Sequence, residues 1–157
     1  MWSVNARSLD DLAAAFGACT LPKTEWTHVA HLRVGAWHVH RLGAERALEM
    51  LRPGIRRLNE QHGTANTPTG GYHETITVAY VRLIADFFAA FEADVEIEQR
   101  VAMLIDGPLG ERSALFSFWS KDRLMSEWAR AEWVPPDLAP LAVPPAVLAT
   151  IGRRAPP

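Results

Sequence analysis

Apolar residues recur every three or four positions along most of the chain, the spacing that places them on one face of an α-helix. The pattern predicts six helices, over residues 8–18, 24–42, 44–62, 72–91, 95–105 and 120–132. Ser8 and Thr24 suit the N-terminal caps of the first two helices, and Gly43 suits the end of the second. Pro53 interrupts the third helix, but the apolar stripe keeps its phase, so we predict a kink within one helix.

These elements predict an all-α fold class: a bundle of five or six helices in one domain that spans residues 1–157. No alternating pattern of useful length indicates a strand. Seven of the eleven prolines lie in the last 23 residues, which changes the expectation for that end. We predict that residues 134–157 form an extended tail packing on the bundle, with a short helix near 146–151. A flexible segment that binds a partner is the alternative.

Composition narrows the classes of function without naming one. The chain is 48% hydrophobic and 22% charged, ordinary values for a globular domain. Its formal net charge of −2 does not indicate a nucleic-acid binder, and no apolar run is long enough to span a membrane. The N-terminus lacks a signal-peptide pattern, and Cys19, the single cysteine, cannot form an internal disulfide. We expect a cytoplasmic protein with a small-molecule ligand and no nucleic-acid or membrane partner. The oligomeric state stays open.

The candidate chemistry lies in the placement of the six histidines. Short connections favour an up-down-up arrangement of the second, third and fourth helices, which brings two helix starts and one helix end together. His28 and His31 lie at the start of the second helix, His62 at the end of the third, and His73 at the start of the fourth. Four histidines are therefore predicted at one end of the bundle.

A divalent metal site is the first hypothesis for this cluster. His28 and His31 are three residues apart on one helix face, so both rings can bind one ion, and His73 would be the third ligand. Glu74 would be a general base or a fourth ligand. Zinc is the preferred ion, with nickel and iron as alternatives. The predicted function is a metal-dependent enzyme of hydrolase or lyase type.

Two other readings stay open. Histidines on an apolar stripe often serve as hydrogen-bonded core residues, in which case the chain is a non-catalytic helical binding module. Such a module would bind its partner through the third helix and the proline-rich tail. The third reading is a metal-free enzyme that uses the same pocket for acid–base chemistry.

The loop over residues 63–71 is predicted to cover the histidine site. It is rich in Thr, Asn, Pro and Gly, and it is longer than most connections within bundles. Thr67 and Thr69 would offer hydroxyl groups to a ligand, and Thr77 is a further candidate on the inward stripe of the fourth helix. An ordinary helix connector is the alternative.

Two segments, EWTHVAHL (25–32) and NTPTGGYHETIT (66–77), resemble a family of small, uncharacterised bacterial helical proteins. The similarity continues through a later stretch and spans most of the chain; its residues there are Trp119-Ser120, Ala129-Arg130 and Pro136-Asp137-Leu138.

The resemblance implies no particular activity and carries over no catalytic residue. It places His28, His31 and His73-Glu74 within the motif segments of that family. In size and helical content the chain also resembles the DinB-like metal-binding bundles, which usually carry HxxxH where this chain has HxxH.

Overall fold

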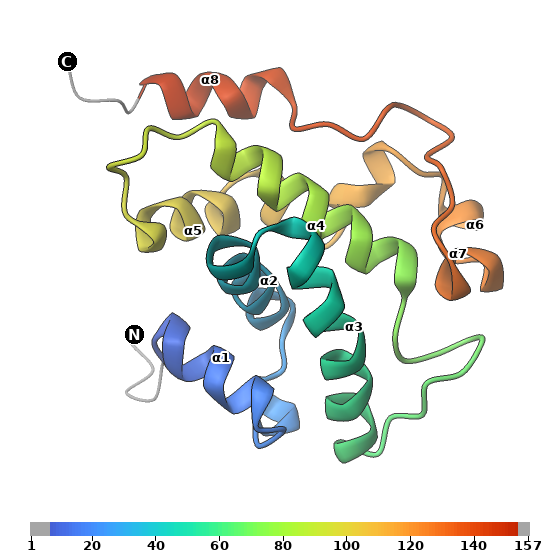
Figure 1. Ribbon diagram of the computed structural model, residues 1–157. Helices are drawn as coiled ribbons and strands as arrows, with labels where there is room; N and C mark the ends of the chain where they lie inside the picture. Colours follow the sequence, from blue (N-terminus) through green and yellow to red (C-terminus); the bar gives the residue numbers. More distant parts are fainter. Residues whose placement is uncertain (1–6, 154–157) are drawn as a thin grey trace.

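Eight α-helices and three short 3-10 helices make up the regular structure of residues 7–153, the part of the chain that the computed structural model describes (Figure 1). The α-helices are α1 (Leu9–Gly17), α2 (His28–Leu42), α3 (Ala44–Gln61), α4 (Glu74–Ala89), α5 (Ile97–Asp106), α6 (Lys121–Leu124), α7 (Glu127–Ala131) and α8 (Pro145–Arg153). The 3-10 helices are η1 (Lys23–Glu25), η2 (Pro108–Gly110) and η3 (Ala114–Ser117).

The all-α prediction is confirmed, because no strand occurs between residues 7 and 153. The predicted number of helices was five or six. Six of the eight helices have seven residues or more, and α6 and α7 are single turns. The predicted helix over 120–132 is split in two because Ser126 caps a new helix, its hydroxyl accepting a hydrogen bond from the Ala129 N–H at 3.1 Å.

Side-chain caps also set where the longer helices begin. The Ser8 cap is confirmed: its hydroxyl accepts a hydrogen bond from the Asp11 N–H at 3.1 Å. Thr24 as the cap of the second helix is wrong, because Thr24 lies inside η1 and Thr27 accepts from the Ala30 N–H instead. Gly43 ends this helix with a φ of +80°, as predicted.

Helix α2 is the centre of the packing, in contact with α1, α3, α4 and α5. Its buried residues therefore lie around most of its circumference instead of along one stripe. His38, one of them, donates from Nδ1 to the Val34 carbonyl at 2.7 Å.

Helix α3 is continuous through Pro53, with one buried face. Gly54 on that face lets α1 come close, since a Cβ at this position would lie 2.7 Å from the Phe16 ring.

The C-terminal segment contributes to the same core. Val134, Val143, Val147 and Ile151 are all buried in the cluster that also holds α1 to α5. The short helix predicted near 146–151 is confirmed as part of α8. In Figure 1, α8 is drawn above the C-terminal half of α4. Residues 154–157 of the predicted tail lie outside the described residues.

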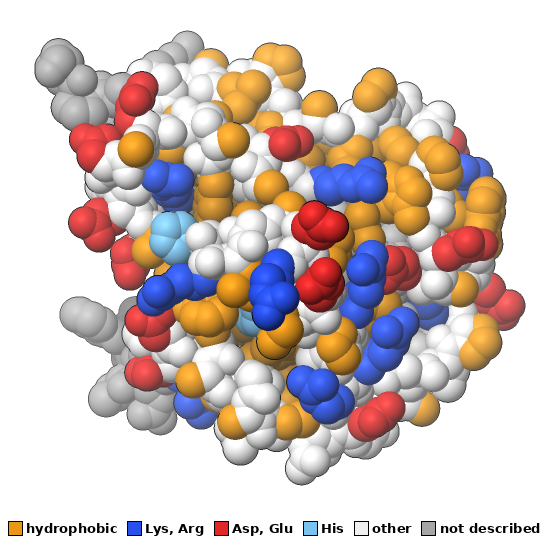
Figure 2. All heavy atoms as spheres, in the orientation of Figure 1, with side chains coloured by type: hydrophobic (Ala, Val, Ile, Leu, Met, Phe, Trp, Pro, Cys, Tyr) orange, Lys and Arg blue, Asp and Glu red, His pale blue; other side chains and the backbone are white. Residues whose placement is uncertain are grey.

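The surface carries no uninterrupted charge of one sign on the face drawn in Figure 2, where Lys and Arg side chains alternate with Asp and Glu. None of the helices in the described range is long and apolar enough to cross a lipid bilayer.

Candidate functional site

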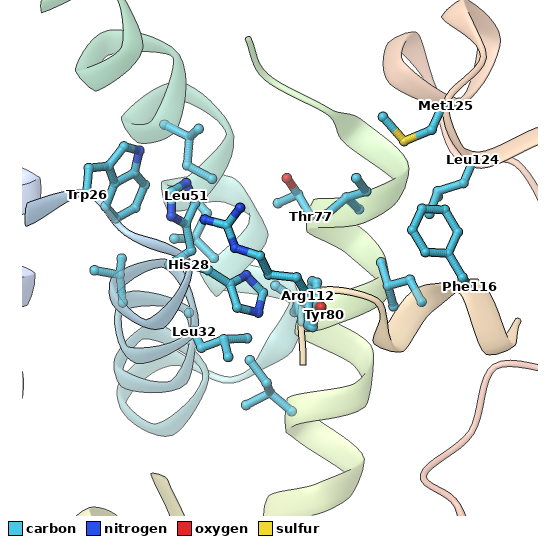
Figure 3. Close-up of a pocket in the computed structure, with 18 residues that line it drawn as sticks. Trp26, His28, Leu32, Leu51, Thr77, Tyr80, Arg112, Phe116, Leu124 and Met125 are labelled. Carbon is cyan, nitrogen blue, oxygen red and sulfur yellow. The ribbon is translucent and has the colours of Figure 1, made fainter. Parts of the chain in front are cut away.

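A cavity of about 400 Å³ lies between α2, α3, α4 and the segment that runs from η2 to α6 (Figure 3). Its walls are mostly apolar, and the polar side chains among them come from α2, α4 and residue 112. The lining residues are Trp26, His28, His31, Leu32, Val34, Gly35, Leu51, Ile55, Ile76, Thr77, Tyr80, Val81, Ile84, Arg112, Leu115, Phe116, Leu124 and Met125. A few polar groups converging in an apolar cavity of this size are typical of small-molecule sites.

His28 joins α2 to η2. Its Nε2 lies 3.0 Å from the carbonyl oxygen of Gly110, and a carbonyl only accepts, so Nε2 carries the hydrogen. Nδ1 then has a lone pair. The ring meets Tyr80 edge-on, with centroids 6.1 Å apart. The hydrogen bond therefore fixes both the tautomer and the orientation of this imidazole.

His31, one helical turn later, is fixed in the opposite sense. Its Nδ1 donates to the Thr27 carbonyl at 2.6 Å, which leaves Nε2 with the lone pair. The ring stacks on Trp26 at a centroid distance of 3.6 Å, and the residue is exposed. Although the residue keeps exposed surface, the groups packed around the imidazole remove water from it and lower the pKa of His31; its hydrogen bond to Thr27 opposes this, and His28 and Arg112 lower the pKa further. The ring is thus neutral at neutral pH, with Nε2 able to accept a proton.

Arg112 and Tyr80 are further polar groups of the cavity, beside Thr77. Figure 3 shows the Arg112 side chain extending across the cavity toward α2, and its charge is felt at His31. No ion pair or hydrogen bond holds its guanidinium among the described residues, and no Asp or Glu lines the cavity. Burial raises the pKa of Tyr80 to about 12, so its hydroxyl keeps its proton.

His73 does not line this cavity, although it was the predicted third metal ligand. It is buried as the N-terminal cap of α4: Nδ1 accepts from the Ile76 N–H at 3.1 Å, and Nε2 donates to the Leu124 carbonyl at 2.7 Å. Burial lowers the pKa of His73, although its bond to Leu124 opposes this. Both ring nitrogens are occupied within the fold, so neither is available to an ion.

Glu74, the predicted base, also points to partners within the fold. Arg52 donates to both of its carboxylate oxygens, with the shortest contact at 2.8 Å, and the Tyr72 hydroxyl donates at 2.7 Å. Burial by itself raises the pKa of Glu74, but the hydrogen bonds from Arg52 and Tyr72 outweigh it and hold the pKa below its usual value. This carboxylate connects α3 to α4 as a permanent anion and does not line the cavity.

Of the four other predicted site residues, one lines the cavity and three do not. Thr77 lines the cavity, with its hydroxyl hydrogen donated to the His73 carbonyl at 2.8 Å. His62 donates from Nε2 to the Leu21 carbonyl at 2.7 Å and lies elsewhere, as do Thr67 and Thr69.

The predicted lid, residues 63–71, is not part of this cavity. Asn66 holds this loop against α3: its side chain accepts from Asn59 at 3.1 Å and from the Tyr72 N–H at 2.9 Å, and it donates to the Arg56 carbonyl at 3.1 Å. The wall opposite α2 is formed instead by residues between 112 and 125.

Within residues 7–153, no group of three or more His, Cys, Asp or Glu side chains is close enough to hold a metal ion. The structure therefore joins His28, His31 and Thr77 in one cavity and separates His73 and Glu74 from them. The sequence could have indicated Tyr80 as a site residue, because it shares a helical face with Ile76 and Thr77. It gave no such indication for Arg112, since the residues around it form only short 3-10 turns.

Comparison with protein-family models, with curated proteins and with solved structures gave no match to this chain.

Proposed function

We propose that the chain is an enzyme that transforms a small organic substrate by acid–base chemistry in the cavity between α2 and α4. The observation that carries the proposal is the pair of imidazoles with fixed tautomers, His28 and His31, facing apolar walls. Each has one nitrogen held as a donor to a backbone carbonyl and the other left with a lone pair.

His31 is the proton acceptor in this proposal. Its Nε2 has no partner among the described residues, and its lowered pKa keeps it neutral at neutral pH. A positioned imidazole of this kind commonly contributes a factor of about 10² to 10⁴ in rate. Tyr80, which keeps its proton, is the neighbouring group able to donate a hydrogen bond to a developing negative charge.

The test uses 5-nitrobenzisoxazole, a neutral heteroaromatic probe of cavity size. A base removes the proton on its ring carbon, the electron pair of that C–H bond forms the nitrile, and the N–O bond breaks to give a coloured phenolate. We expect the protein to accelerate this elimination beyond free imidazole, and His31→Gln to lower the rate about tenfold or more.

His40→Gln is the matched control, because His40 is exposed on the same helix and does not line the cavity. This variant should retain the wild-type rate. The proposal fails if His31→Gln reacts as fast as the wild type, or if the wild type is no faster than imidazole at equal concentration.

A metal-assisted reaction is the second candidate, favoured by the two lone pairs, His28 Nδ1 and His31 Nε2. Ligating imidazoles generally donate their other N–H to a carbonyl or carboxylate, as both rings do here. Zinc, with nickel or iron as alternatives, would take these two rings, and water or substrate would fill its remaining positions.

Zinc titration by calorimetry separates the two candidates. The metal-assisted reaction is supported if zinc binds stoichiometrically and is required for turnover. Zinc binding should then be lost in His28→Gln and kept in His73→Gln. A rate unaffected by zinc or by a chelator supports acid–base catalysis without a metal.

A further inference from the structure

The charge of the cavity identifies the class of molecule that it accepts. Its lining contains one permanent cation, Arg112, two histidines and no carboxylate. Elsewhere in the described residues several arginines have carboxylate or aromatic partners, as with Arg52 on Glu74 and Arg56 over the Tyr72 ring. Arg112 has neither, although it extends into the cavity (Figure 3).

We infer that the substrate is a small organic monoanion, a carboxylate with an apolar body, whose carboxylate pairs with Arg112. The inference rests on the proposed function and specifies what that site binds. A planar guanidinium matches a carboxylate with two parallel hydrogen bonds, and such pairs are stronger than neutral hydrogen bonds. A single cation balances one negative charge, whereas a dianion would leave a second charge uncompensated against apolar walls.

The positions of the polar and apolar groups orient this molecule. Arg112 is exposed and places the carboxylate toward the mouth of the cavity. Val34, Val81 and Ile84 are almost fully buried and form the apolar floor. The body of the substrate therefore extends inward between α2 and α4, from the exposed His31 past the half-buried Tyr80.

The volume limits the size of the body. A cavity of about 400 Å³ has room for roughly a dozen water molecules at about 30 Å³ each. A bicyclic aromatic or a medium-chain aliphatic acid fits this space, whereas acetate would leave most of the apolar wall without a partner.

The test compares 2-naphthoate with its neutral isostere 2-naphthamide and with acetate, each titrated into the full chain and followed by NMR. We expect saturable binding of naphthoate, at least about tenfold tighter than naphthamide and acetate, with shifts at Arg112 and His31. Arg112→Gln should weaken naphthoate binding about tenfold and leave naphthamide binding unchanged. Arg57→Gln, the same change of charge at an exposed arginine outside the cavity, should alter neither.

Equal affinity for naphthoate and naphthamide overturns the inference, as does naphthoate binding that is unchanged in Arg112→Gln or undetectable up to about 10 mM. These outcomes are distinct from failure of the proposed function, because binding is read without turnover. The elimination assay uses a neutral probe and tests His31 whether or not an anion binds.

Discussion

At the scale of single residues, a bond to a backbone carbonyl is common to most of the histidines, so it does not by itself identify the candidate reactive ones. Five of the six histidines donate to a backbone carbonyl, and their acceptors are Gly110 (His28), Thr27 (His31), Val34 (His38), Leu21 (His62) and Leu124 (His73). Only His28 and His31 also line the cavity. Position relative to the cavity, more than residue type, separates the candidate reactive histidines from those that support the fold.

Two tryptophans that differ in burial and in hydrogen bonding allow a test at this scale. Trp119 is fully buried and donates from Nε1 to the Val134 carbonyl at 3.0 Å, whereas the buried Nε1 of Trp26 has no partner among the described residues. Replacing Trp119 by Phe leaves a buried carbonyl without its donor, at a cost of about 1–3 kcal/mol beyond the lost volume. Replacing Trp26 by Phe removes an unsatisfied donor, which offsets part of its lost packing.

We therefore expect Trp119→Phe to lower the free energy of unfolding by at least about 1 kcal/mol more than Trp26→Phe does. Urea denaturation of the two variants measures the difference. Equal losses would contradict the hydrogen-bond assignment at Trp119.

At the scale of elements, α4 connects the bundle to the C-terminal segment through one threonine. Thr75 has no exposed surface, donates its hydroxyl hydrogen to the Glu132 carbonyl at 2.8 Å and accepts from the Val134 N–H at 3.1 Å. Arg130 adds a second connection by donating to the Gly71 carbonyl at 2.8 Å. The Thr75 bonds hold the segment after α7 against α4, and the Arg130 bond holds α7 against the loop before α4.

Thr75→Val keeps the side-chain shape and removes both hydrogen bonds. We expect a loss of about 1–3 kcal/mol in the free energy of unfolding, because the Val134 N–H stays buried without an acceptor. Thr77→Val is the control, since the His73 carbonyl also accepts from the Thr77 backbone N–H and keeps a partner. Urea denaturation in which both variants lose the same stability would show that the Thr75 bonds do not contribute.

At the scale of the whole molecule, buried neutral histidines make the fold sensitive to mild acid. Burial lowers the pKa of both His38 and His73 from the usual 6.5, although each ring's bond to a backbone carbonyl opposes the shift. In the unfolded chain the same rings take up a proton near pH 6.5. Their contribution to stability is therefore complete above pH 6.5 and decreases as the pH falls below it, because only the unfolded chain binds protons in that window.

We expect the free energy of unfolding to fall between about pH 6.5 and about pH 5, by no more than about 1.4 kcal/mol per pH unit for each histidine. The pKa of Glu74 lies below its usual value of 4.5, so its contribution to stability decreases only at lower pH. Urea denaturation across this range measures the effect. His73→Asn, which keeps a capping oxygen, should flatten the pH dependence, whereas His40→Asn should not; the same slope in both variants would rule out His73 as its source.

The helical pattern and the capping residues were enough to predict most of the fold from the sequence alone. The all-α class, the Ser8 cap, the end of α2 at Gly43, the continuity of α3 through Pro53 and the short helix in the tail all depend on neighbours within a few residues. The predicted start of the second helix at Thr24 and the single helix predicted over 120–132 were wrong for the same local reason. Several Ser and Thr residues can cap a helix, and the backbone conformation selects one of them.

The site depended on contacts between distant parts of the chain, and only tertiary packing determines those. The i, i+3 spacing of His28 and His31 was enough to place both rings in one cavity. His73 does not line the cavity, because its ring caps α4 and donates to the Leu124 carbonyl, 51 residues away. Glu74 pairs with Arg52, 22 residues earlier in the chain. Arg112 lines the cavity although it lies in a segment with no periodic pattern. A local pattern determines which face of a helix a residue occupies, but the bonding partner of a polar side chain is the nearest available group in space, which the order of residues does not reveal.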